Sequence, residues 1–229
     1  MRRSYILVLL MVLLSLVSNA QTLTGTTGLL NIPSADIPAD GTFIVGGNYL
    51  PKINEAVGNY NTGNFYFNLT FLPFLEVAFK STFIKRNSTG YYTGQDRSAN
   101  VRLQLLKEKE SMPAITIGIH DLYTEDKIGN QHSGATYIVL TKHFDVNQTT
   151  IGVTSGYGLK ILKHNQFTGV FGGLSLTHRS FKPLTLMSEY DGNGVNIGGS
   201  LLLFKHLYLL SMAQQLKYLT GGVAYRIHL

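Results

Sequence analysis

Hydrophobic and polar side chains alternate along most of this chain with a period of two residues. In residues 64–71 the apolar set is Phe65, Phe67, Leu69 and Phe71, and three of the four intervening residues are Asn or Thr. The same alternation recurs near 75–85, 113–120 and 219–229. Successive side chains of a β-strand point to opposite faces, so the pattern predicts strands with one apolar face each. The chain is therefore expected to be all-β.

Marking every such run predicts about twelve strands, and ten or fourteen remain open because strand edges are the least certain part of such a prediction. The expected strands are residues 42–50, 63–72, 75–85, 98–107, 113–120, 135–144, 149–158, 168–178, 184–190, 195–204, 207–216 and 219–229. Through the first eight strands, long and short connections alternate. Outer-membrane barrels have short periplasmic turns, longer outer loops and an even strand count. We therefore expect a closed antiparallel transmembrane β-barrel.

A secreted β-sandwich is the soluble alternative, since its strands also alternate. Composition argues against it, because only 14% of residues are charged and the apolar faces are spread over more strands than one core can absorb. Mean hydropathy is only +0.08, and beyond residue 17 no apolar run is long enough for a membrane-spanning helix. Strands that have one uncharged apolar face and one polar face are typical of a barrel with lipid outside.

The first twenty residues read as a secretory signal peptide, with Arg2 and Arg3 before an apolar stretch and a small-residue cleavage site ending at Ala20. An uncleaved N-terminal anchor is the alternative. The expected organisation is a signal peptide (1–20), a periplasmic or plug-like segment (21–41) and the barrel (42–229), in the outer membrane of a Gram-negative bacterium. The segment 21–41 is rich in Gly, Pro, Ser and Thr. It is expected either to plug the lumen or line its mouth, or to be a simple lead-in to the first strand.

Six charged side chains are predicted to face the lumen. They are Glu76, Lys80, Arg102, Lys142, Glu189 and Arg226, of which Lys142 lies in the strand with the poorest alternation. One interpretation is a lumen filled by paired carboxylates and cationic groups, which are costly when buried alone. The other is a narrow aqueous path with a cationic bias, suited to anionic solutes.

The sequence contains no convincing catalytic or metal pattern. Histidine and serine come together at His132-Ser133 and at His178 and Ser180, but neighbours in sequence rarely have the geometry of a catalytic pair. Asp121, Glu125, Asp126 and His132 match no calcium or zinc spacing. We expect no enzyme activity, no cofactor and no metal, with a lipid-acting hydrolase as the remote alternative. A formal charge of +6 spread along the chain does not indicate nucleic-acid binding.

Three stretches resemble the YjbH-like outer-membrane proteins, which are associated with exopolysaccharide production and export. They are residues 24–36 with the later Gly41, residues 113–121 and residues 137–142, and the resemblance spans roughly residues 24–160. It implies a role in exopolysaccharide export. Together with the predicted lumen charges, this makes an acidic polysaccharide that passes or docks at a weakly basic lumen or periplasmic mouth one expected partner. The alternating end, Tyr225 to Leu229, resembles the signal read by the barrel-assembly machinery.

Two further roles stay open from the residues alone. The barrel is expected to contact outer-membrane lipid in every case. In the first alternative it is a closed structural barrel that anchors envelope proteins through the loops at 51–62, 86–97 and 121–134. In the second it is the lipid-acting hydrolase.

Overall fold

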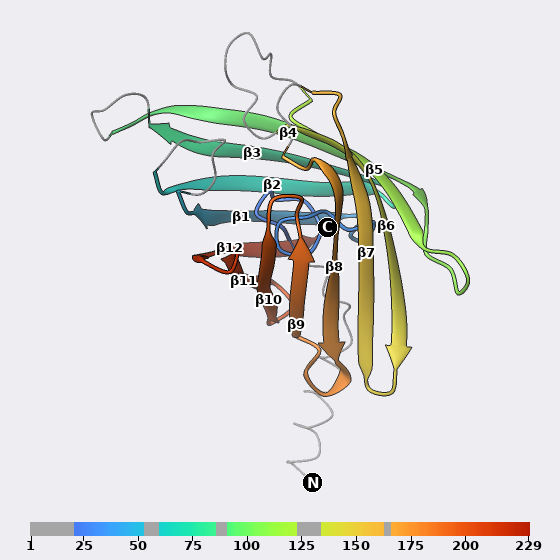
Figure 1. Ribbon diagram of the computed structural model, residues 1–229. Coiled ribbons are helices and arrows are strands. Elements are labelled where there is room, and N and C mark those ends of the chain that lie inside the picture. The colour runs from blue at the N-terminus through green and yellow to red at the C-terminus, as the bar shows by residue number, and fades with distance from the viewer. Residues whose placement is uncertain (1–20, 53–59, 86–90, 123–133, 163–165) are drawn as a thin grey trace.

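The computed structural model describes residues 21–52, 60–85, 91–122, 134–162 and 166–229. Within these ranges, twelve antiparallel strands form a closed barrel, in which each strand pairs with its neighbours in sequence and the last pairs with the first (Figure 1). The predicted closed barrel and its strand count are confirmed. The predicted signal peptide, residues 1–20, lies outside the described residues.

The strand bounds follow the alternation of the sequence closely. They are β1 (Thr42–Leu50), β2 (Thr62–Leu72), β3 (Leu75–Lys85), β4 (Tyr92–Leu106), β5 (Ala114–His120), β6 (Ala135–Val146), β7 (Thr149–Leu159), β8 (Gly169–His178), β9 (Leu184–Tyr190), β10 (Val195–Leu203), β11 (Leu207–Gln214) and β12 (Tyr218–His228). The largest difference is in β4, which begins at Tyr92 instead of residue 98. Its polar start was read as loop, yet it pairs with the end of β3, where Asp96 lies opposite Thr82. Backbone pairing there does not need an apolar face.

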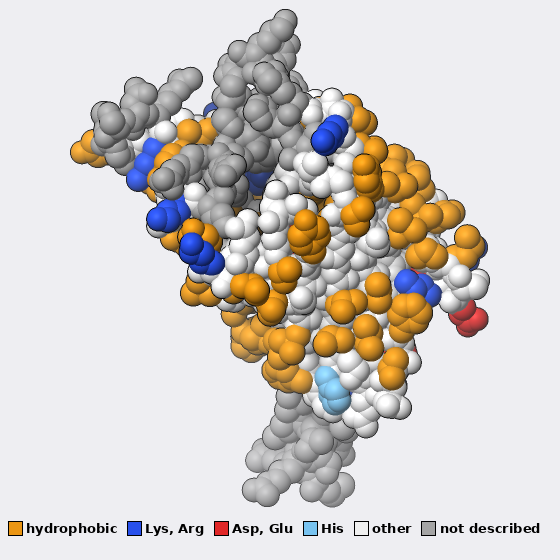
Figure 2. All heavy atoms as spheres, viewed as in Figure 1, with side chains coloured by type: hydrophobic (Ala, Val, Ile, Leu, Met, Phe, Trp, Pro, Cys, Tyr) orange, Lys and Arg blue, Asp and Glu red, His pale blue; other side chains and the backbone are white. Residues whose placement is uncertain are grey.

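The outer wall of the barrel is apolar and exposed. Phe65, Phe67 and Phe71 on β2 are 43%, 44% and 47% exposed, whereas Asn64, Asn68 and Thr70 between them are buried. Figure 2 shows hydrophobic side chains over much of the visible barrel wall. In water such a surface would be costly, and a lipid bilayer removes that cost. Apart from the end of β6, the outward-facing and inward-facing sets are those that the period of two predicts.

Arginine at a mid-wall position is expected to destabilise the barrel. Phe67 lies inside β2 and points outward, so Phe67→Arg places a charge in the hydrocarbon layer at a cost of about 2–4 kcal/mol. Phe74 is equally exposed but lies in the turn between β2 and β3, so Phe74→Arg is expected to cost at most about 1 kcal/mol. Urea unfolding in lipid vesicles, followed by circular dichroism, measures both. Equal losses would contradict a membrane-embedded wall.

The two ends of the barrel differ in the connections that they carry. The connections after β2, β4, β6, β8 and β10 meet at one end, together with the start of β1 and the end of β12. That end also carries the short 3-10 turn Arg179–Phe181. Short turns and both chain ends face the periplasm in outer-membrane barrels. We call this the periplasmic end.

Among the described residues, no helix is long and apolar enough to cross a membrane.

Candidate functional site

The lumen is filled by the chain's own N-terminal segment. Residues 21–35, called the plug from here on, are all buried, although they form only isolated bridges and turns. In Figure 1 this blue segment lies within the ring of strands. Gly25 adopts a positive φ of 79°, and a Cβ there would lie 2.5 Å from Cγ of Tyr66. Only glycine allows the plug to pass so close to the wall.

Glu189 of β9 anchors the middle of the plug. Its carboxylate accepts hydrogen bonds from the backbone N–H groups of Leu30 (2.9 Å), Asn31 (2.8 Å) and Ile32 (3.3 Å). It also accepts one from the side-chain amide of Asn196 on β10, at 2.8 Å. A single wall carboxylate therefore satisfies three buried backbone donors of a segment that lacks regular secondary structure.

A buried ion pair holds the plug at Thr27 and near its C-terminal end. Arg102 of β4 forms a salt bridge with Glu76 of β3, and both side chains are fully buried. Glu76 accepts a hydrogen bond from the backbone N–H of Thr27, at 2.8 Å. The guanidinium of Arg102 donates to the backbone oxygen of Ser34 and, at 3.3 Å, to that of Asp36. Each charge thus has an opposite charge and plug backbone as partners, which offsets the cost of burial.

Amide and hydroxyl side chains from the wall satisfy much of the remaining plug backbone. Asn48 and Asn64 both donate to the oxygen of Leu23, at 3.1 and 2.9 Å. At the other end, Gln104 and Thr116 donate to the oxygen of Ala35, at 2.8 and 2.7 Å. Bulky inward side chains occupy further space, and they include Tyr66, His120, Tyr137, Phe167, Phe171 and Tyr208. The arrangement is that of a filled lumen.

The structure distributes the six predicted lumen charges unequally. Glu76, Arg102 and Glu189 contact the plug, and Lys80 is buried in β3, where the charges of Asp96 and Asp121 act on it. Arg226 is on the inward side of β12, partly exposed near the end of the strand, and donates to the backbone oxygen of Lys205 at 3.3 Å.

Lys142 does not line the lumen as predicted. It shares its side of β6 with exposed Leu140 and Phe144, and His143 takes the inward position. Both faces are polar in this part of the strand, so alternation did not indicate which residue points inward. The ammonium of Lys142 donates instead to Glu108 at 2.9 Å and to the backbone oxygen of Lys109 at 2.6 Å.

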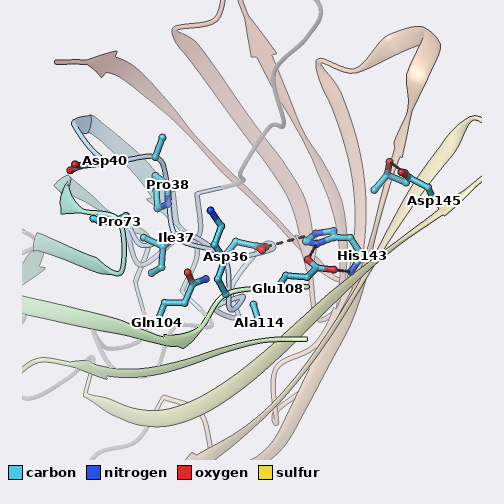
Figure 3. Close-up of a pocket in the computed structure, with 13 residues that line it drawn as sticks. Asp36, Ile37, Pro38, Asp40, Pro73, Gln104, Glu108, Ala114, His143 and Asp145 are labelled. Carbon is cyan, nitrogen blue, oxygen red and sulfur yellow. Dashed lines mark hydrogen bonds and ion pairs between the residues drawn. The ribbon is translucent and has the colours of Figure 1, made fainter. Parts of the chain in front are cut away.

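A pocket of about 680 Å³ opens below the plug at the periplasmic end (Figure 3). Its ionisable lining residues are Asp36, Asp40, Lys107, Glu108, His143 and Asp145. Four of these six are carboxylates, so the pocket is more acidic than basic. The weakly basic mouth expected from the lumen charges is therefore not found at this pocket.

Asp36 and Glu108 are two of the three pocket carboxyls whose pKa values are shifted. Burial raises the pKa of Asp36 above its ordinary value, although His143, Ser34 and Arg102 act in the opposite direction. For Glu108, burial alone would raise the pKa, but hydrogen bonds from His143 and Lys142 bring it below the ordinary value. Glu108 is thus held as a carboxylate by its neighbours.

The family follows from a comparison with protein-family models. Residues 20–170 match the model YjbH, described as exopolysaccharide biosynthesis protein YbjH. The chain belongs to the YjbH family. The match covers the plug, the first seven strands and the start of β8. No curated protein sequence matches this YjbH-family chain.

Solved structures similar to the YjbH-family chain include two outer-membrane phospholipases. One is the Salmonella typhi outer membrane phospholipase dimer with bound calcium, at 11% identity and a TM-score of 0.41, covering 82% of this chain and 89% of that chain. The other is outer membrane phospholipase A from Escherichia coli, at 10% identity and a TM-score of 0.37, covering 82% and 96%.

Of the two histidine and serine pairs noted in the sequence, the structure describes His178 and Ser180. His132 and Ser133 lie outside the described residues, as do Glu125 and Asp126. His178 and Ser180 lie at the exposed 3-10 turn of the periplasmic end, where the backbone N–H of Ser180 donates to Nδ1 of His178 at 3.2 Å.

The sequence reasoning missed Asp36, Glu108 and His143 of this YjbH-family barrel, which come together at the pocket. Asp36 directly follows the plug, Glu108 lies in the turn between β4 and β5, and His143 belongs to β6. No short-range spacing relates three residues so far apart in the chain, so no sequence motif pointed to them.

Proposed function

We propose that this protein acts in exopolysaccharide export at the outer membrane as a closed, non-enzymatic barrel, which anchors or docks other export components at its periplasmic end. The family match supports the link to exopolysaccharide. The single observation that supports closure is the plug, whose backbone is hydrogen-bonded to Glu189 and to Glu76 deep inside the barrel.

The charge of the periplasmic pocket favours docking over passage of an acidic glycan. Its lining includes Asp36, Asp40, Glu108 and Asp145 against Lys107 and His143. Glu108 and Asp145 are paired with Lys142 and Arg179, so the like charge that an acidic glycan would meet in this pocket comes from Asp36 and Asp40. A partner protein or a neutral glycan at the periplasmic end avoids that repulsion.

Planar-bilayer recording tests closure. The wild-type protein is expected to show no steady ion conductance, because the plug fills the lumen. A variant that lacks residues 22–35 is expected to conduct ions, since the wall would then enclose an unfilled polar lumen. A steady conductance of the wild-type protein, or a conductance that appears when polysaccharide is added, would contradict the closed barrel and support passage through it.

Cells test the export role separately. In the bacterium that carries the gene, its deletion is expected to lower surface polysaccharide several-fold, and the wild-type gene should restore it. Unchanged polysaccharide would reject the role while leaving the closed barrel intact.

A gated passage is the second candidate. It is favoured by the way the plug is held, since hydrogen bonds to wall side chains can be exchanged for bonds to water. The lipid-acting hydrolase is the third, and it predicts that Ser133→Ala or Ser180→Ala abolishes a lipase activity in detergent. No activity of the wild-type protein on any lipid would remove it.

A further inference from the structure

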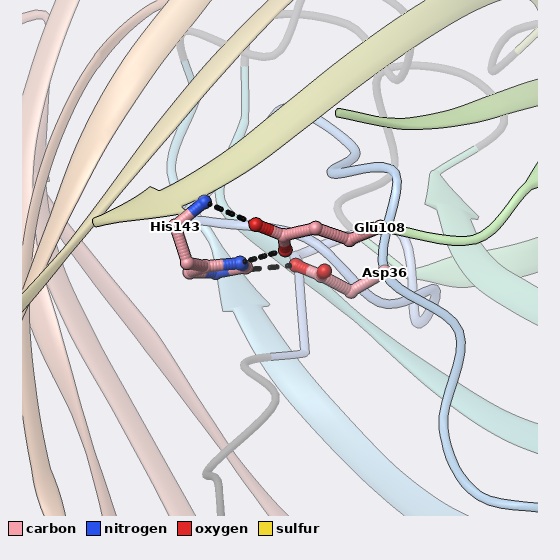
Figure 4. Close-up of side chains that lie close together, drawn as sticks. All are labelled: Asp36, Glu108 and His143. Carbon is pink, nitrogen blue, oxygen red and sulfur yellow. Dashed lines mark hydrogen bonds and ion pairs between the residues drawn. The ribbon is translucent and has the colours of Figure 1, made fainter. Parts of the chain in front are cut away.

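Three potential metal ligands meet where the plug leaves the lumen. Asp36 directly follows the plug, Glu108 lies in the turn between β4 and β5, and His143 is the inward residue near the end of β6. One ligand atom from each side chain lies within 4.8 Å of the other two. Figure 4 shows the imidazole of His143 beside both carboxylates.

Glu108 sets the orientation of the imidazole. Its carboxylate faces the backbone N–H of His143 at 2.8 Å and Nδ1 of the ring at 2.7 Å. The ammonium of Lys142 holds the same carboxylate at 2.9 Å. With the Nδ1 proton donated to Glu108, Nε2 is the free ring nitrogen. A histidine oriented by a carboxylate in this way is the usual arrangement in protein metal sites.

The free nitrogen faces Asp36 across a gap that suits a metal ion. Nε2 of His143 and Oδ2 of Asp36 are 3.9 Å apart, too far for a direct hydrogen bond. Zinc binds nitrogen at about 2.0–2.1 Å and carboxylate oxygen at about 2.0–2.2 Å in a tetrahedral arrangement, so its two ligand atoms lie about 3.4 Å apart, and Asp36 would approach His143 by about 0.5 Å on binding. Ser34 donates to Oδ2 of Asp36 at 3.0 Å and fixes that carboxylate.

The surroundings favour a cation with open coordination positions. The pocket beside the cluster has a volume of about 680 Å³ and also carries Asp40 and Asp145. It has room for water ligands, and its negative charge attracts a divalent ion. Imidazole as a ligand favours zinc, copper, iron or nickel over calcium or magnesium.

We propose that a divalent transition-metal ion of the zinc type binds between His143 and Asp36, with Glu108 as the positioning carboxylate and water from the pocket as the remaining ligands. Because Asp36 follows the plug and His143 belongs to the wall, the ion fastens the plug to the barrel. This inference does not depend on the role in exopolysaccharide export.

Calorimetric titration of zinc chloride into the metal-stripped, detergent-folded barrel tests the site. We expect one ion per chain, with affinity lowered at least tenfold in His143→Ala and in Asp36→Asn, and about 10–100-fold in Glu108→Gln. The matched control is His206→Ala. His206 lies at the same end of the barrel, stacked on Tyr225, and outside the cluster, so its variant should bind like the wild type.

Hydrogen exchange supplies a second readout that a purely structural role would not produce. Zinc is expected to slow exchange of the backbone amides at residues 34–36 at least threefold in the wild type and not in His143→Ala. Asp36 lies outside the strands, so the Asp36→Asn variant is expected to fold. It provides the same test if His143→Ala fails to fold. The proposal is overturned if the wild type does not bind zinc stoichiometrically, or if Asp36→Asn and Glu108→Gln bind it as tightly as the wild type. The three side chains would then form only an ion-pair cluster.

Discussion

Replacement of Arg102 by methionine is expected to cost about 3–5 kcal/mol of folding free energy, among the largest effects of any single substitution in the barrel. Arg102 and Glu76 are fully buried and paired with each other. Methionine keeps much of the side-chain volume but leaves the Glu76 carboxylate without its opposite charge. The bonds from Arg102 to the backbone oxygens of Ser34 and Asp36 are lost as well.

Urea unfolding in lipid vesicles measures this loss, and circular dichroism is the suitable signal because the chain has no tryptophan. Arg226→Met is the matched control. Arg226 is partly exposed near the end of β12 and donates to the backbone oxygen of Lys205, so its loss should cost at most about 1 kcal/mol. The double variant Glu76→Gln with Arg102→Met should recover part of the loss, because no unpaired charge remains. If Arg102→Met and Arg226→Met both lose little folding free energy, the buried pair contributes little to stability.

Substitution of Glu189 by leucine is expected to release the middle of the plug while the barrel stays closed. The backbone N–H groups of Leu30, Asn31 and Ile32 would lose their acceptor. Each buried donor without a partner costs about 1–3 kcal/mol, so the bound plug is destabilised by at least about 3 kcal/mol. That corresponds to more than a hundredfold in the equilibrium between bound and released plug.

Hydrogen exchange at residues 30–32 measures the release, and exchange is expected to be on the order of a hundredfold faster in Glu189→Leu. Glu110→Gln removes an exposed carboxylate at the periplasmic end and should leave these amides unchanged. Heat-dependent gel migration shows in both variants whether the barrel remains closed. If exchange at the plug stays slow in Glu189→Leu, Glu189 is not what holds the plug.

Much of the wall could be predicted from the sequence because each strand carries its own evidence. The alternation around Phe67 places that side chain outward and Asn68 inward, and both placements hold in the structure. Where both faces are polar, the local pattern loses its power. Residues 92–97 were expected to be loop, but they belong to β4. In β6, Lys142 was expected to face the lumen, but His143 takes the inward position.

The plug and its site depend on contacts that no local pattern records. Thr27 meets Glu76, which is 49 residues away in sequence, and Leu30 meets Glu189, which is 159 residues away. The composition of residues 21–41 indicated only that they lack a strand or helix of their own. Which alternative holds for them, plug or lead-in, depends on whether wall side chains satisfy their backbone.

The sequence by itself determined an all-β barrel with an apolar outer wall, because the period of two is a property of each strand and survives without its neighbours. Only the tertiary structure decided that the lumen is filled, that Glu76, Arg102 and Glu189 hold the plug, and that Asp36, Glu108 and His143 meet below it. The physical reason is that closing the barrel brings distant strands around one short segment. Buried charges and backbone donors can then be satisfied only by partners far along the chain.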